Sequence, residues 1–387
     1  MNTRVVFAAY YYCPYVSGLT LHVRGLAEGL ARLGWDVHVV AVQHDLSLPR
    51  SEVIGGVSVH RVRPVAAVDK GMFAPGFVSA VRRRAAGGAA IVPVLPLIEA
   101  PLLAIGDFRD RTLPLYICDL RLGPGAVSRA IEGLAHAGAR VAVRRAPAFF
   151  ASSEEYIRAS RVLHGTATPL VPAPPPIDVA RFRPTDYAVL EEHLGLIGRR
   201  RIGFVGRLVA EKGILVLLDA FDELRREMPD LHLVIAGEGK VVAGGGMHDE
   251  IARRVGADER VQLTGFLPDG KLPAFYSMLD VLVLPSIDPL EAYGMVQVES
   301  MLCGTPVVAS DMPGVRIPVS ETGMGRLTPP GDAQSVARAI REILEEPECF
   351  HRPRAQIARA FDPEIPVANL DSALRRYVSY RSARQRV

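Results

Sequence analysis

Short apolar runs alternate with longer amphipathic stretches along most of this chain. Residues 4–9 form an apolar run after Arg4 and predict a buried strand, while residues 19–33 place apolar side chains on one helical face and end before Gly34. Further strand-length runs in the first half of the chain are residues 36–42, 57–62, 91–95, 113–118 and 148–151. Strands that alternate with helices predict a parallel, doubly wound α/β sheet.

A proline-rich stretch separates this series from a second one. Residues 171–178 read Val-Pro-Ala-Pro-Pro-Pro-Ile-Asp, and consecutive prolines continue neither a helix nor a sheet. After it, strands are predicted at residues 201–205, 231–236, 261–264, 281–284 and 306–309, with helices between them. We therefore predict an N-terminal Rossmann-like domain over residues 1–175, a C-terminal one over residues 176–365, and a final helix over residues 366–387 that packs back on the first domain.

The composition is that of an ordinary globular protein. Hydrophobic residues make up 49% of the 387 positions, and no apolar run approaches the roughly 20 residues of a membrane span. The first ten residues turn polar too soon for a signal peptide. The four cysteines show neither Cys-x-x-Cys spacing nor a disulfide framework. We expect a cytoplasmic protein with no transmembrane segment.

The charges are unevenly distributed. Residues 1–175 carry 19 Lys or Arg against 12 Asp or Glu, and the remainder carries 26 against 30. This imbalance is too mild for a nucleic-acid binder, and no aromatic–basic motif supports one. A basic first half is compatible with an anionic acceptor or with peripheral contact to an anionic membrane surface. We expect a monomer or homodimer with no nucleic-acid partner.

Two carboxylates stand eight positions apart where the chain passes from the strand at residues 281–284 into the next helix. Glu291 precedes the helix and Glu299 lies within it. The simplest interpretation is that the helix dipole favours Glu291 and that Glu299 faces solvent. Glu299, however, stands among apolar neighbours such as Val298 and Met301, so we expect it to face a cleft.

The spacing of these carboxylates argues against a glycosidase acid–base pair. Eight helical steps rise roughly 12 Å, whereas the carboxyl groups of glycosidases stand about 5 to 9.5 Å apart. The two carboxylates therefore suit hydroxyl groups at separate points of one extended ligand.

Two cations follow the first strand of the second series. Arg207 and Lys212 lie five positions apart in one loop, which suits a diphosphate, although a surface loop with two basic residues is common. In the first half, Ser17-Gly18 opens a predicted helix whose backbone N–H groups could meet a phosphate. Neither Asp-x-Asp nor any cluster with metal-ligand spacing occurs. We therefore expect no metal and no cofactor, with cations and helix N-termini neutralising the phosphates.

Taken together, these residues resemble the family 4 glycosyltransferases, which are retaining enzymes of the GT-B fold. The motifs that carry the resemblance are Gly206-Arg207-x4-Lys212-Gly213, Glu291-x7-Glu299 and Cys303-Gly-Thr-Pro-Val-Val-Ala-Ser310, with supporting matches at residues 150–154, 175–178, 182–184 and 280–286. The resemblance covers nearly all of the second half but mainly the first strand and helix of the first half. It implies two doubly wound, Rossmann-like domains that face a cleft.

The resemblance also implies a role for each motif residue toward a nucleotide-diphosphate sugar, which serves as a co-substrate. Arg207 and Lys212 would hold the diphosphate. Glu291 would hold hydroxyl groups of the transferred sugar, and Glu299 those of the ribose. The helix start that would meet the phosphates comprises Tyr293, Gly294, Met295 and Val296. Gly265 and Phe266 would line the nucleobase pocket, and Gly18 would approach the diphosphate from the first half.

The chain departs from the family pattern at two places. The first-half loop usually carries two glycines and here reads Ser17-Gly18, which implies a differently shaped contact with the diphosphate. The family often has a His-Asp pair after the strand near residue 117, and here the pair is Cys118-Asp119. Asp119 is the candidate substitute for a catalytic contact with the acceptor or sugar.

The expected function is metal-independent transfer of a sugar, from a UDP-sugar in preference to a GDP-sugar, to an acceptor hydroxyl with retention of configuration. Short loops such as residues 123–125 favour a small polar acceptor, for example a natural-product intermediate. A lipid-linked or cell-envelope glycan acceptor stays open. So do an epimerase or phosphorylase on the same fold and a nucleotide-sugar-binding module without activity.

Overall fold

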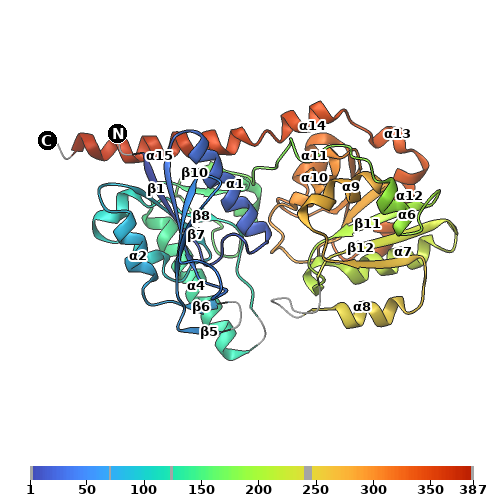
Figure 1. The fold of residues 1–387 in the computed structure, drawn as a ribbon, viewed down its shortest axis with the longest axis horizontal. Helices are drawn as coiled ribbons and strands as arrows, with labels where there is room; N and C mark the ends of the chain where they lie inside the picture. Colours follow the sequence, from blue (N-terminus) through green and yellow to red (C-terminus); the bar gives the residue numbers. More distant parts are fainter. Residues whose placement is uncertain (1–2, 69–70, 123–124, 239–245, 385–387) are drawn as a thin grey trace. The chain divides into compact units, whose positions relative to one another are not determined.

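The computed structural model describes residues 3–68, 71–122, 125–238 and 246–384 (Figure 1). The chain divides into two compact units. Unit 1 holds the residues up to Pro176 together with those from Pro363 on, and unit 2 holds Ile177–Asp362. Each unit is built on a sheet of mainly parallel strands with helices packed against it, so the predicted α/β class with two Rossmann-like sheets is confirmed.

Within the described residues, the main sheet of unit 1 has eight strands in the order β10-β9-β8-β7-β1-β2-β4-β3. These strands are β1 (Arg4–Ala8), β2 (Asp36–Val42), β3 (Ser51–Ile54), β4 (Val57–Val62), β7 (Ala90–Leu95), β8 (Leu115–Tyr116), β9 (Phe149–Ala151) and β10 (Leu170–Pro172). All pair in parallel except β3, which runs antiparallel to β4 at the edge. A second, two-stranded sheet pairs β5 (Ala66–Val68) with β6 (Gly71–Phe73).

Several of these features differ from the sequence prediction. Strands β3, β5, β6 and β10 were not predicted, because each spans only three or four residues. The predicted strand at residues 113–118 is also shorter, since only Leu115 and Tyr116 pair as a named strand with their neighbours. The first half is therefore a mixed sheet with one antiparallel edge strand, not a purely parallel one.

The helices of unit 1 cover both faces of its main sheet. They are α1 (Gly18–Arg32), α2 (Phe77–Arg84), α3 (Ala100–Leu103), α4 (Ala126–Arg145), α5 (Glu154–Ala159), α15 (Glu364–Arg384) and a 3-10 turn, η1 (Gly106–Arg111). Val5 and Val37 join side chains of α1 and α15 in one buried cluster. Val6 and Val40 alternate with them along β1 and β2 and are also buried, where α2 packs.

The C-terminal helix α15 is part of unit 1 and runs beside α1 (Figure 1). Val367 and Leu370 belong to the same buried cluster as the α1 side chains. Trp35 donates a hydrogen bond from Nε1 to Asp371 over 2.6 Å. These contacts attach the end of the chain to the first strand–helix unit despite more than three hundred intervening positions.

Unit 2 contains a six-stranded parallel sheet in its described residues, in the order β13-β12-β11-β14-β15-β16. Its strands are β11 (Arg200–Val205), β12 (Leu231–Ala236), β13 (Val261–Gly265), β14 (Val281–Leu284), β15 (Val307–Ser310) and β16 (Gly325–Thr328). The chain first builds outward from β11 to β13 and then returns to add β14 on the other side of β11. This reversal is a topological switch point, where α/β sheets bind ligands beyond the carboxyl ends of their strands.

Helices cover both faces of this sheet as well. One buried cluster joins the sheet to α9 (Leu272–Met278) and α10 (Met295–Leu302), and another joins it to α7 (Ile214–Leu224) and α12 (Ala333–Glu345). The other helices of unit 2 are α6 (Ala188–His193), α8 (His248–Val255), α11 (Ile317–Thr322), α13 (Pro347–Phe350), α14 (Arg354–Ala360) and the 3-10 turns η2 (Ala210–Lys212) and η3 (Asp269–Lys271). A sheet packed on both faces is doubly wound.

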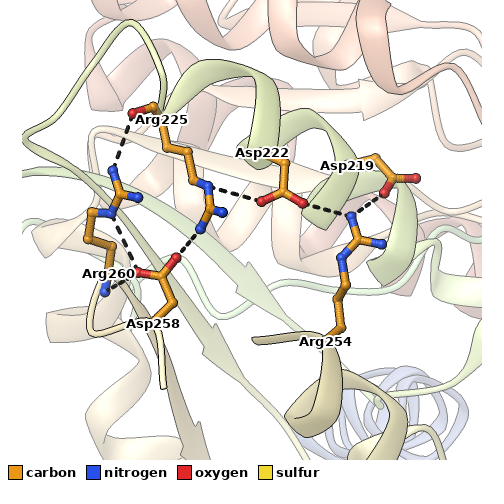
Figure 2. A network of polar contacts seen from close by, with 6 residues as sticks. All are labelled: Asp219, Asp222, Arg225, Arg254, Asp258 and Arg260. Atoms are coloured by element: carbon orange, nitrogen blue, oxygen red, sulfur yellow. Dashed lines mark hydrogen bonds and ion pairs between the residues drawn. The ribbon is translucent and has the colours of Figure 1, made fainter. Parts of the chain in front are cut away.

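A network of ion pairs joins α7, α8 and the turn before β13 (Figure 2). Arg254 of α8 contacts Asp219 and Asp222 of α7 over 2.6 and 2.7 Å. Arg225, which follows α7, contacts both Asp222 and Asp258. Because exposed ion pairs contribute little individually, the chief consequence of this network is the fixed placement of α8 against α7.

None of the helices among the described residues is long and apolar enough to span a membrane.

Candidate functional site

The switch point of unit 2 brings two loops together that are distant in sequence. β11 and β14 pair in parallel, with Ile202 opposite Val281. Because parallel strands end at the same edge of a sheet, the loop after Val205 and the loop after Leu284 emerge side by side. The first carries the predicted cations and the second carries Glu291.

Lys212 and Glu291 form an ion pair across these two loops. The Lys212 ammonium contacts Glu291 Oε2, and the side chains are 20% and 14% exposed. Ser286 Oγ also donates to Glu291 Oε2, over 3.4 Å. Burial alone would raise the pKa of Glu291, but Lys212, with a further contribution from Arg207, holds that pKa below its usual value. Glu291 is therefore kept as an anion beside a cation.

Two further contacts fix the β11 loop against the β14 loop. The Ile287 N–H donates to the carbonyl of Glu211 over 3.0 Å. Gly213 has a left-handed φ of +66°, and a Cβ there would stand 1.9 Å from the carbonyl oxygen of Pro285. Only glycine permits this approach. The Glu211 side chain contacts the Arg207 guanidinium over 2.7 Å, so the loop that holds Lys212 also orients Arg207.

Helix α10 begins at Met295, four positions after Glu291. Its N-cap is Gly294, with a φ of +76°, and no side chain caps the helix. Met295 and Val296 form its first turn, where backbone N–H groups have no partner within the helix. Tyr293 is buried beside this turn. An uncapped helix start, four positions after the Glu291 that Lys212 contacts, provides N–H donors and a positive dipole end for an anion.

Glu299 lies in the middle of α10 and is 6% exposed. Its Oε2 accepts a hydrogen bond of 2.7 Å from the hydroxyl of Tyr276, a residue of α9. Burial raises the pKa of Glu299 to about 7, although the Tyr276 hydrogen bond and the charge of Arg181 act in the opposite direction. Unlike Glu291, this carboxylate forms no ion pair with any described residue that would offset its burial. A buried acid that titrates near neutrality is typical of a functional position.

The predicted helical spacing of the two carboxylates was wrong in one respect. Because α10 begins at Met295, Glu291 lies in the preceding loop and eight helical steps do not separate it from Glu299. Glu291 stands before the amino end of the helix, and Glu299 follows one turn inside it. The conclusion that they serve separate points of a ligand stays a prediction.

The other predicted positions lie at the ends of strands or helices. Gly265 ends β13, and the Phe266 side chain that follows is 58% exposed, as a ring available for stacking would be. In unit 1, Gly18 is the first residue of α1, and a Cβ there would meet no described heavy atom within 4 Å. Ser17 is the N-cap of that helix and forms a reciprocal capping box with Thr20.

Asp119 is held by hydrogen bonds within unit 1. Its carboxylate accepts from the Tyr116 hydroxyl, from Ser160 Oγ over 2.5 Å and from the Arg161 N–H over 2.9 Å. These donors fix the loop after β8 to the segment after α5. The contacts give Asp119 a structural role, and its role toward an acceptor stays a prediction.

Sequence reasoning missed three residues that organise the site: Tyr276, Glu211 and Ser286. Tyr276 reads as one apolar position of an amphipathic helix, and nothing in the sequence indicates that its hydroxyl meets Glu299. Glu211 stands four positions after Arg207, a spacing that could have suggested an ion pair. In the part of the chain that the structure describes, no group of three or more His, Cys, Asp or Glu residues is arranged to hold a metal ion.

Two family models match the chain, one for each half. Residues 17–176 match a glycosyl transferase 4-like domain, and residues 193–360 match the glycosyl transferases of group 1. The second match contains both members of the Lys212–Glu291 pair and Glu299.

Curated relatives match part of the chain. A 2-deoxystreptamine glucosyltransferase of Streptomyces kanamyceticus is 35% identical over 44% of this chain and 43% of its own length. A D-inositol 3-phosphate glycosyltransferase of Segniliparus rotundus is 32% identical over 48% of this chain and 42% of its own length. The chain therefore spans less than half the length of these relatives. The crystal structure of Anabaena HepE in complex with UDP and glucose has a TM-score of 0.73, with 22% identity over 97% of this chain and 99% of that one.

We expect Gly213→Ala to lower the free energy of unfolding by roughly 2–3 kcal/mol, because the new Cβ would collide with the Pro285 carbonyl. The matched control is Gly198→Ala, where φ is +71° but a Cβ would meet no described heavy atom within 4 Å. That control should cost about 1–2 kcal/mol for its backbone conformation. Urea unfolding measures both, and equal losses would show that the contact between the two loops is unimportant.

Glu299→Gln should stabilise the protein more at pH 8 than at pH 5. The folded pKa of about 7 lies above the ordinary 4.5, so between these values the folded protein binds more protons than the unfolded chain. The stability of the natural protein therefore falls as pH rises through this window, and Glu299→Gln removes that loss, by about 2–3 kcal/mol between pH 5 and 8.

Denaturant unfolding at several pH values measures this difference, with Glu192→Gln on the exposed side of α6 as the control. A difference between Glu299→Gln and the natural protein that does not change with pH would show that the Glu299 carboxylate is not perturbed by burial.

Proposed function

We propose that this chain, which belongs to the family 4 glycosyltransferases of the GT-B fold, transfers a sugar from a nucleotide-diphosphate sugar to a hydroxyl group of an acceptor. The observation that supports this most is the partly buried Lys212–Glu291 pair at the switch point of unit 2, with Arg207 acting on Glu291 as well. Lys212 is a cation held at the carboxyl ends of the strands, where it can bind a diphosphate.

The diphosphate is the part of the donor for which this site is best equipped. Lys212 supplies a point charge and Arg207 a planar set of N–H donors, which Glu211 holds in orientation. The first-turn N–H groups of α10 add donors that no side chain occupies. We propose that these groups neutralise the phosphates without a metal ion.

The two carboxylates bind hydroxyl groups on either side of the diphosphate. Glu291 is an anion at the pH of the cell, and a carboxylate accepts strong hydrogen bonds from sugar hydroxyl groups. Glu299 accepts from the ribose. The order along the donor is then sugar at Glu291, diphosphate at Lys212 and Arg207, and ribose at Glu299, with Phe266 at the nucleobase.

The chemistry follows from where charge develops. As the bond between the anomeric carbon and the leaving oxygen breaks, negative charge grows on the terminal phosphate of the nucleoside diphosphate. Lys212 and Arg207 are fixed beside that charge before the reaction begins, so they stabilise the transition state without reorganising. The acceptor hydroxyl attacks the anomeric carbon on the face from which the diphosphate departs, and it gives its proton to a donor phosphate oxygen. Because attack and departure use the same face, the sugar retains its configuration.

A small polar acceptor and a UDP-sugar are the specific substrates that we propose. Two of the relatives are named for small molecules, 2-deoxystreptamine and D-inositol 3-phosphate. The excess of Lys and Arg in residues 1–175 equally suits an anionic lipid-linked acceptor. A GDP-sugar is the alternative donor.

Release of the nucleoside diphosphate tests this function. The protein is incubated with UDP- and GDP-sugars, with and without a panel of polar and lipid-linked acceptors, in the presence of EDTA. We expect release that depends on an acceptor and persists in EDTA, and a product whose anomeric configuration by NMR equals that of the donor. Turnover without an acceptor would indicate an epimerase, and dependence on inorganic phosphate a phosphorylase. No release with any pair would contradict the proposal.

Lys212→Met should weaken the binding of a nucleoside diphosphate by roughly 10- to 100-fold, because it removes one charge-assisted contact. Binding of the corresponding nucleoside should change much less, since the nucleoside has no phosphate. Isothermal titration calorimetry measures both affinities, with Arg338→Met on the exposed side of α12 as a control for the loss of one surface charge.

The removal of Lys212 also leaves Glu291 buried without its cation, which destabilises the fold. The double variant Lys212→Met/Glu291→Gln avoids this cost and should bind the diphosphate as weakly as the single variant. Equal weakening of diphosphate and nucleoside binding would remove Lys212 from the phosphate site.

A further inference from the structure

Tyr276 and Glu299 form a buried pair in which the tyrosine hydroxyl contacts only one of the two carboxylate oxygens. The Tyr276 side chain is fully buried, and its hydroxyl lies 2.7 Å from Glu299 Oε2. Within the described part of the chain, no other hydrogen bond to the Glu299 carboxylate accompanies it. The second oxygen, Oε1, therefore keeps its acceptor capacity.

The Tyr276 ring cannot change place easily. It packs edge-on against Phe182 and Phe275, with ring centroids 6.1 Å apart in both cases. Its backbone carbonyl accepts a hydrogen bond of 2.6 Å from Thr305 Oγ1, which ties α9 to the turn before β15. These contacts fix the position of the hydroxyl whether or not a ligand is bound, which is the condition for preorganisation.

The hydroxyl also acts only as a donor toward Glu299. Burial, together with the nearby Glu299 carboxylate, raises the pKa of Tyr276 well above its usual value, so the phenol stays protonated. The other charges that act on Glu299 are Arg181, which favours the carboxylate, and Asp269, which opposes it. Cys303 directly follows α10 as its C-cap residue.

Helices α11 and α14 pack beside α10 and carry charged groups that act on the residues flanking α10. On α11, Glu321 acts on Tyr293, and on α14, Arg354 acts on Cys303. Among the described groups, the Tyr276 hydroxyl is thus the one direct hydrogen-bond partner that favours the charged form of Glu299.

We propose that Tyr276 is a positioning residue of the ribose subsite, whose hydroxyl holds one oxygen of Glu299 so that the other oxygen accepts hydrogen bonds from the ribose. This inference rests on the proposed function, because it requires a nucleotide at Glu299. A phenylalanine at this position would keep the edge-on ring contacts with Phe182 and Phe275. The Tyr276 hydroxyl adds two effects that phenylalanine lacks. It fixes the orientation of the Glu299 carboxylate and it favours the charged form of that carboxylate.

A purely structural role and a positioning role predict different behaviour toward ligands without ribose hydroxyl groups. If Tyr276 only maintains the fold, Tyr276→Phe should affect all nucleotides alike. If it positions Glu299, the loss should be confined to nucleotides whose ribose hydroxyl groups use Oε1. The affinity of such nucleotides should also rise with pH as Glu299 loses its proton, and the midpoint should depend on Tyr276.

The experiment compares the natural protein with Tyr276→Phe by calorimetric binding of UDP, GDP and their 2′,3′-dideoxy counterparts between pH 5.5 and 9. We expect the variant to lose roughly 3- to 10-fold in affinity for the nucleotide with ribose hydroxyl groups and less than about 2-fold for the dideoxy form. The pH midpoint for the first nucleotide should move upward by up to about one unit, because the variant lacks the hydrogen bond that favours the carboxylate.

Two controls accompany this comparison. Tyr12→Phe removes another buried hydroxyl, which has no hydrogen-bond partner in the described structure, and should leave all affinities unchanged. In a Glu299→Gln background, Tyr276→Phe should no longer shift any pH midpoint. Should Tyr276→Phe fail to fold, the natural protein alone still provides a test. Its affinity for the nucleotide with ribose hydroxyl groups must rise more steeply near pH 7 than that for the dideoxy form, because the terminal phosphate titrates in both.

The outcomes separate the two proposals. An equal loss for both nucleotide forms, or no loss for either, would overturn the role of Tyr276 and leave the proposed function intact. A natural protein that binds neither diphosphate at any pH would contradict the proposed function and with it this inference.

Discussion

The pairing of β11 with β14 is the constraint on which the site depends. It places a strand next to one that the chain reaches only after completing β12 and β13, so the loops after both strands share one edge of the sheet. Lys212 can meet Glu291 only because of this arrangement. The Gly213 approach to Pro285 and the hydrogen bond from Ile287 to Glu211 then fix the two loops together. A change in that pairing would separate the cations from the carboxylate.

The two carboxylates, one partly and one almost fully removed from solvent, differ in how their charge is treated. Glu291 is partly buried beside a cation, so its charge is retained and its pKa is lowered. Glu299 is buried beside a hydroxyl, so its pKa rises to about 7 and its charge depends on pH near neutrality. The first arrangement favours a permanent anion at the phosphate end of the helix. The second carries a cost in stability, which natural proteins accept mainly where a group has a function.

Much of the fold and part of the site could be predicted from sequence. In unit 2, β12, β14 and β15 follow mainly apolar runs, and β12 and β14 begin and end at the predicted residues. Strand β16, which reads Gly-Arg-Leu-Thr, was not predicted. The cations and carboxylates were found through their spacing. What sequence could not predict are contacts between residues far apart in the chain. Tyr276 is indistinguishable from a core residue until α9 packs on α10, and Asp119 shows its internal partners only once the segment after α5 folds against it.

The central claim is that the site binds one nucleotide sugar in a fixed direction, from the sugar at Glu291 to the ribose at Glu299. A crystal structure of the protein with a bound nucleoside diphosphate tests this most directly. We expect the terminal phosphate within hydrogen-bond distance of Lys212 Nζ and a ribose hydroxyl on Glu299 Oε1. A nucleotide bound in the reverse direction, with its ribose at Glu291, or bound away from both carboxylates, would contradict the claim.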